Sequence, residues 1–214
     1  MKLQSTEDRL RAEYFQLLPA LRRVREHLET QIRYALLPLS GSAATHERVV
    51  VTSRIKECES AIEKLRRKEE GRQFNPDLMS SYTLTSLKDL VGVKVLTFPR
   101  KLRVLADSAL RETFPDWTAD PFREGSKLGF KYVGRSAAND TISAEYQILP
   151  TFVGMFWDLE HTAVYKRDPA LASSRREVIA LKEKSSEAIL ALIAFEDSVE
   201  RSFQEGPDSP TGPT

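Results

Sequence analysis

The chain has 214 residues, enough for one substantial hydrophobic core but short for two large domains. Its 32 Lys and Arg residues balance 31 Asp and Glu residues, which gives a net charge of +1, so any site for a polyanion must be local. The single cysteine, Cys58, excludes a disulfide framework and a zinc site built from cysteines. Because we find no signal peptide and no long apolar run, we expect a cytoplasmic protein with no membrane contact.

Long amphipathic helices are predicted at both ends of the chain. Apolar residues recur at alternating steps of three and four from Leu10 to Leu28, so they share one face, and Pro19 could kink this helix. A second stripe, from Val178 to Val199, occupies heptad positions. The two helices could pack as an arm over the core, or against another copy of the chain in a homo-oligomer.

Strands and helices alternate between these two ends. The predicted strands are Val49–Thr52, Leu90–Phe98 and Thr141–Leu149, and the predicted helices are Arg54–Lys68, Arg100–Phe114 and Phe152–Tyr165. Leu37–Thr45 has turn chemistry and is predicted to be a loop, and Gly71–Ser81 is predicted to be irregular and mobile. This order favours an α+β fold with a mixed β-sheet of about five strands covered by helices.

The strand from Thr141 to Leu149 alternates in character. Its even positions from Ile142 to Ile148 are apolar, whereas Glu145 and Gln147 project together from the other face. An acid in the middle of a strand either faces solvent or belongs to a site.

The predicted helix Arg54–Lys68 gathers polar side chains on the face opposite its apolar stripe. Lys56, Ser60, Lys64 and Arg67 recur there at steps of three and four, with Arg54 just ahead. Such a face could hold a triphosphate, because ammonium and guanidinium groups make short charge-assisted hydrogen bonds to phosphate oxygens. A solvated helix whose cations are balanced by five glutamates has the same pattern.

Residues 125–132, GSKLGFKY, combine glycines, lysines and aromatic residues. A base could stack on Phe130 and a phosphate could pair with Lys127 or Lys131, although an ordinary β-hairpin explains this composition equally well. His161, on the helix after Pro150, is more typical of a structural hydrogen bond than of a metal ligand.

Five short motifs follow one another in a specific order. They are Ser53-Arg54-Ile55-Lys56 with Ser60 and Glu63-Lys64-Leu65, Asp89-Leu90-Val91-Gly92-Val93-Lys94-Val95, Gly129-Phe130-Lys131, Glu145-Tyr146-Gln147-Ile148, and Trp157 with Glu160-His161 and Tyr165-Lys166. In this order and spacing, residues 49–166 resemble the synthetase domain of the RelA/SpoT family. Because only helices flank this region, the chain is similar to the small alarmone synthetases, which transfer pyrophosphate from ATP to the ribose 3′-hydroxyl of GDP or GTP.

The resemblance implies a nucleotidyltransferase-like mixed sheet and a synthetase core over 46–168. The apolar stripes predict an N-terminal helix over 1–36 and a C-terminal helix over 173–205, and the Pro, Gly and polar composition of residues 206–214 predicts a disordered tail.

The resemblance also implies roles for individual residues. The residues implied to bind ATP are Arg54, Lys56, Ser60, Lys64 and Arg67. Asp89 and Glu145 are implied to bind Mg²⁺, with Glu145 also able to take the proton from the attacking hydroxyl. The residues implied to bind the acceptor are Phe130, which would stack on its base, with Lys127, Lys131, Gln147 and His161.

Several positions depart from the family pattern, and all of them lie in the acceptor half. Lys94 and Leu149 stand where the family commonly has arginine, a histidine is missing near Gly134, and one extra residue lies between Gln147 and Trp157. Because Asp89, Glu145 and the donor half are kept, the pattern fits a changed acceptor better than a dead enzyme. Toxic members of the family make adenosine alarmones or pyrophosphorylate the 3′ CCA end of tRNA.

Three hypotheses about function follow. We predict a pyrophosphokinase that acts on GDP or GTP. The first alternative is a toxin-like enzyme that acts on tRNA or adenine nucleotides, with an antitoxin as a possible partner. A basic patch continuous with the site would favour tRNA, although solvated helix faces would have the same sequence pattern. The second alternative is a catalytically silent interaction protein. The candidates for a basic patch are Arg22, Arg23, Arg25, Arg66, Arg67 and Lys68.

Overall fold

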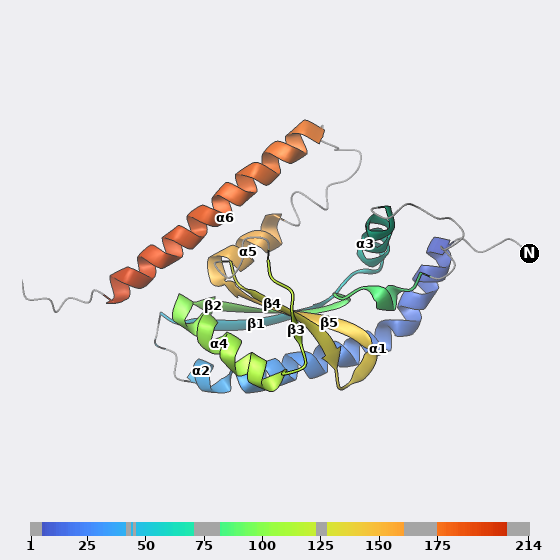
Figure 1. The fold of residues 1–214 in the computed structure, drawn as a ribbon, viewed down its shortest axis with the longest axis horizontal. Helices are drawn as coiled ribbons and strands as arrows, with labels where there is room; N and C mark the ends of the chain where they lie inside the picture. Colours follow the sequence, from blue (N-terminus) through green and yellow to red (C-terminus); the bar gives the residue numbers. More distant parts are fainter. Residues whose placement is uncertain are drawn as a thin grey trace, which may run out of the picture.

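The computed structural model describes residues 6–41, 44, 46–70, 82–122, 128–160 and 175–204. Within them, five strands form one mixed sheet in the order β1-β2-β5-β4-β3 (Figure 1). The strands are β1 (Arg48–Ile55), β2 (Val91–Phe98), β3 (Thr118–Ala119), β4 (Phe130–Ser136) and β5 (Asn139–Pro150). The helices are α1 (Thr6–Ala35), α2 (Leu37–Gly41), α3 (Cys58–Glu70), α4 (Arg100–Thr113), α5 (Thr151–Glu160) and α6 (Arg175–Gln204), with one 3₁₀ turn at Leu84–Ser86. The predicted α+β class is confirmed.

The centre of the sheet pairs β2 with β5 in parallel, while every other pair of strands is antiparallel. The register places Gly92 opposite Glu145 and Lys94 opposite Gln147, and on the other side of β2 it places Arg54 opposite Gly92. Because side chains alternate along a strand, these residues share one face of the sheet.

The opposite face of the sheet carries the main core. Val93, Val95, Tyr146 and Ile148 are fully or almost fully buried there, where α1 and α4 cover this face (Figure 1). The alternation predicted for residues 141–149 is therefore correct. At one end of the other face, α5 lies across the sheet so closely that a Cβ on Gly154 would come within 2.2 Å of a Leu96 methyl carbon.

Helix α3 begins later than predicted, because β1 continues to Ile55 and takes Arg54 into the sheet. The β-branched run from Val49 pairs with β2 along its whole length, up to Ile55 opposite Val91. The backbone N–H of Lys56 then donates to the Leu90 carbonyl at 2.8 Å, which extends this pairing. Pairing with a central strand thus overrides the helical spacing of the sequence.

Two other predictions need correction. Residues 37–41 form α2 rather than a loop, since Pro38 is tolerated in the first turn of a helix and the N–H of Ser40 donates to the Leu36 carbonyl at 3.0 Å. The terminal helices do not pack together as an arm. Figure 1 shows α1 beneath the sheet and α6 on the other side, where it packs on α5.

Some predictions fall on residues outside those described: the irregular segment 71–81, the end of the helix predicted to reach Tyr165, and the tail 206–214. Among the helices that are described, none is both long and apolar enough to cross a membrane.

Candidate active site

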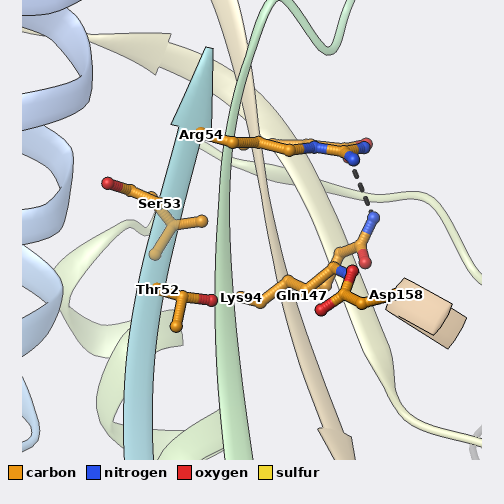
Figure 2. A pocket seen from close by; sticks show the side chains of 9 residues that line it. Thr52, Ser53, Arg54, Lys94, Gln147 and Asp158 are labelled. Atoms are coloured by element: carbon orange, nitrogen blue, oxygen red, sulfur yellow. Dashed lines mark hydrogen bonds and ion pairs between the residues drawn. The ribbon is translucent and has the colours of Figure 1, made fainter. Parts of the chain in front are cut away.

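A cavity of about 260 Å³ opens on the sheet face that carries Glu145. It is lined by Thr52, Ser53, Arg54, Gly92, Val93, Lys94, Glu145, Gln147 and Asp158 (Figure 2). Strands β1, β2 and β5 supply the floor, and Asp158 of α5 stands at one end. Figure 2 shows Ser53 pointing away from the other polar side chains, and its hydroxyl donates to Glu29 of α1.

Asp89 precedes β2 and is 7% exposed. Its Oδ2 accepts from Lys64 Nζ at 2.6 Å and lies 3.0 Å from Lys56 Nζ. Burial raises the pKa of Asp89, but the two lysines outweigh burial and hold this pKa below its ordinary value. Asp89 is therefore charged. Its other oxygen, Oδ1, is buried and has no hydrogen-bond partner among the described residues.

Glu145 lies beside this cluster in the centre of β5. Burial raises its pKa, and the neighbouring charge of Asp89 raises it further, while Lys64 and two other cations partly oppose this shift. The amide of Gln147 donates to Glu145 Oε1 at 2.9 Å. A buried carboxylate with a raised pKa and a defined orientation is suited to accept a proton.

Glu145 and Arg54 converge above Gly92. A Cβ on this glycine would lie 3.7 Å from Glu145 Oε1 and 3.9 Å from Arg54 Cγ. The structure therefore brings one cation of the predicted donor group next to the predicted base, although Arg54 comes from β1 and Glu145 from β5.

The far end of the cavity carries an ion pair between Lys94 and Asp158 (Figure 2). In the sequence, Lys94 is only a departure from the family pattern, and neither Asp158 nor Thr52 has a predicted role in the site. A signal for Lys94 was present, because it lies two residues after Gly92 in a strand and therefore shares the face of Gly92. No comparable signal marks Asp158.

Three other predicted residues do not line the cavity. Ser60 and Arg67 are on α3, and Arg67 pairs with Glu63 at 3.4 Å. Lys131 shares the face of Gln147, its partner in the strand register. Its ammonium is already paired with Asp120 at 2.8 Å.

Phe130 is placed differently from the expectation. The strand register sets it opposite Ile148, and its ring packs against the main core on the other face from Glu145. The structure thus separates Phe130 from the cavity, because a motif match gives a residue type but not the face to which its strand turns it. The other two predicted acceptor residues, Lys127 and His161, lie outside the described residues.

The residues present fit a magnesium ion. No group of three or more His, Cys, Asp or Glu that could hold a metal occurs within the part of the chain that the structure describes. Mg²⁺ needs fewer protein ligands, because it keeps several waters and is often held by one or two carboxylates together with substrate phosphates. The unpartnered Oδ1 of Asp89 and the adjacent Glu145 meet that requirement.

Protein-family models and curated proteins were both searched, and neither search found a match. Solved structures do match. Small alarmone synthetase 1 from Bacillus subtilis is 18% identical, with 91% of this chain and 100% of that chain covered at a TM-score of 0.62. A GTP pyrophosphokinase family protein from Streptococcus pneumoniae is 19% identical, with coverages of 90% and 95% and a TM-score of 0.59.

Small alarmone synthetase 2 from Bacillus subtilis is 16% identical, with 86% of this chain and 97% of that chain covered at a TM-score of 0.57. Synthetase 1 has also been solved bound to AMPCPP and bound to its product pppGpp. At these identities the likeness concerns the fold. The chain has the fold of the small alarmone synthetases.

Proposed function

We propose that this protein is a pyrophosphokinase that transfers the β- and γ-phosphates of ATP to the ribose 3′-hydroxyl of GDP or GTP, making (p)ppGpp. One observation carries the proposal. A buried charged carboxylate, Asp89, and a second carboxylate of raised pKa, Glu145, lie together beside a cavity in a fold shared with small alarmone synthetases.

The donor side would be formed by the cations around Asp89. Lys56 and Lys64 both contact Asp89 Oδ2, and Arg54 lies above Gly92. When ATP binds, the two lysines can exchange their contacts with Asp89 for phosphate oxygens and Arg54 can add its own, which neutralises the charge of the transferred group. Ser60 and Arg67 on α3 would contact the nucleotide from its outer side.

Asp89 and Glu145 would hold the Mg²⁺, which when bound supplies charge neutralisation to the phosphates. Glu145 has a second role as the general base. The acceptor's 3′-oxygen attacks the β-phosphorus of ATP, the bond from that phosphorus to the α–β bridging oxygen breaks, AMP leaves, and the hydroxyl proton passes to the Glu145 carboxylate. Gln147 keeps this carboxylate oriented through its 2.9 Å hydrogen bond.

The acceptor would enter the part of the cavity lined by Gln147, Lys94 and Asp158. The two alternatives have less support. Arg66 pairs with Glu7 and Glu63, and Arg67 with Glu63, so this part of the basic patch predicted for tRNA has no excess of positive charge. A silent interaction protein has no use for a buried carboxylate with an unpartnered oxygen, because such a group costs stability.

The acceptor can be identified directly. The protein is incubated with Mg²⁺ and γ-labelled ATP together with GDP, GTP, ADP or tRNA in separate reactions, and labelled products are separated. We expect label in the GDP and GTP reactions. Label in the ADP or tRNA reaction alone would replace the acceptor assignment, and a folded protein that labels none of the four would refute the enzymatic proposal.

A further inference from the structure

The first half of α1 contacts both segments that carry the donor site. Tyr14 reaches the link between β1 and α3, and Arg9 and Glu13 reach the segment that leads to Asp89. We propose that Tyr14 and Glu13 are positioning residues, which hold Lys56 and Asp89 in register for the triphosphate. This inference rests on the proposed function for its use of ATP, but its contacts belong to the protein alone.

Tyr14 fixes the backbone of Lys56. Its hydroxyl donates to the Lys56 carbonyl at 3.0 Å, while the N–H of Lys56 donates to the Leu90 carbonyl at 2.8 Å. Both backbone groups of Lys56 are thus hydrogen-bonded: its carbonyl to Tyr14 of α1, and its N–H to Leu90, the residue that follows Asp89. Its ammonium, which lies 3.0 Å from Asp89 Oδ2, starts from a fixed main chain.

Glu13, one residue before Tyr14 on α1, holds the segment of chain that leads to Asp89. Its Oε1 accepts from the Leu84 N–H at 2.9 Å and from the Thr83 hydroxyl. These bonds hold the start of the 3₁₀ turn Leu84–Ser86, which precedes Asp89. Arg9 adds a bond from its guanidinium to the Tyr82 carbonyl at 2.5 Å.

Core packing alone does not require the hydroxyl of Tyr14. Tyr14 belongs to the apolar stripe of α1 and is 7% exposed, so a phenylalanine would fill the same space in the core. The hydroxyl adds a bond to a main-chain carbonyl instead. Because Lys56 and Asp89 have 32 residues between them in sequence, a shared support on α1 sets their separation before the nucleotide arrives.

The test compares two substitutions with matched controls. Tyr14→Phe removes only the hydroxyl, and its control is Tyr34→Phe on the same helix, where the ring is 77% exposed. Glu13→Ala removes the acceptor, whereas Glu13→Gln keeps an oxygen that can accept from Leu84 and should restore binding. For each protein we measure the Kd for Mg²⁺-AMPCPP, the melting temperature, and hydrogen exchange of residues 55–58 without nucleotide.

We expect Tyr14→Phe to raise the Kd for AMPCPP by about three- to tenfold, the range that corresponds to one hydrogen bond. Exchange of residues 55–58 should become faster, and Tyr34→Phe should change neither quantity. Glu13→Ala should also weaken AMPCPP binding, and Glu13→Gln should bind close to wild type.

A Tyr14→Phe protein that binds AMPCPP as wild type does, with only a lower melting temperature, would overturn the inference, because the hydroxyl would then serve folding alone. If wild type itself does not bind AMPCPP, the donor site of the proposed function is wrong. Hydrogen exchange alone then tests whether the Tyr14 hydroxyl holds residues 55–58 in place. Equal exchange in Tyr14→Phe and Tyr34→Phe would then overturn it.

Discussion

Replacing Asp89 by asparagine tests how the donor cluster is held together. The substitution keeps the shape of the side chain but removes the charge that Lys56 and Lys64 share. Lys56 is the more buried of the two, with a side chain 14% exposed against 48% for Lys64. The main cost therefore comes from leaving the Lys56 ammonium largely buried without its counter-ion.

The magnitude follows from this difference in burial. Removing one partner of a buried ion pair costs about 3–5 kcal/mol, whereas an exposed pair contributes at most about 1 kcal/mol. Lys56 keeps some contact with water, and Glu145 gains from losing a like charge nearby. We therefore expect Asp89→Asn to lower the free energy of unfolding by about 2–4 kcal/mol at neutral pH.

Urea unfolding measures this loss, with Glu59→Gln as the control. Glu59 pairs with Arg11 at 2.8 Å but is 68% exposed, so its loss should be small. Because the lysines lower the pKa of Asp89, its contribution is present above the ordinary value of 3.8 and disappears as the pH falls through the lowered pKa. Equal stability of the two variants at neutral pH would refute the cluster as a structural unit.

The other predictions concern Glu145, Gly134 and Phe130. Glu145→Gln should lower the transfer rate by about 10²- to 10⁴-fold and weaken AMPCPP binding far less, because Asp89 and the lysines remain. Since the pKa of Glu145 is raised, the wild-type rate should fall with decreasing pH before the ordinary 4.5 is reached. Gly134→Ala should cost about 1–3 kcal/mol in urea unfolding, because the new Cβ would lie 2.4 Å from the Trp117 ring. Phe130→Ala should cost about 1–3 kcal/mol, as expected for a half-buried ring, and should leave the KM of the acceptor unchanged. A raised acceptor KM with unchanged stability would restore Phe130 to the site.

The sequence predicted most strands because their patterns are local. The alternation around Glu145 gave the correct faces of β5, since one face meets a core and the other does not. The start of α3 was wrong because the helical spacing from Arg54 competes with pairing to β2, which lies far along the chain. Long-range pairing of this kind leaves no local sequence signal.

The same reasoning explains which of the predicted residues lie close together and which residues lining the cavity were not predicted. Asp89 and Glu145 come together although 55 residues lie between them, and the motif order had suggested it. Tyr14 was read only as part of an apolar stripe, because a tyrosine that donates to a distant carbonyl looks like any core residue in sequence. Asp158 was missed because it lies on α5, and only the folded structure places this helix next to the residues of β1, β2 and β5 that line the cavity.

The most direct measurement is AMP release from ATP, with and without GDP, in wild type and in Glu145→Gln. The account predicts that wild type forms AMP only when GDP is present, with one guanine product carrying two added phosphates for each AMP. Glu145→Gln should bind AMPCPP but form almost no AMP. AMP formation that is independent of GDP, or that survives Glu145→Gln unchanged, would contradict the central claim.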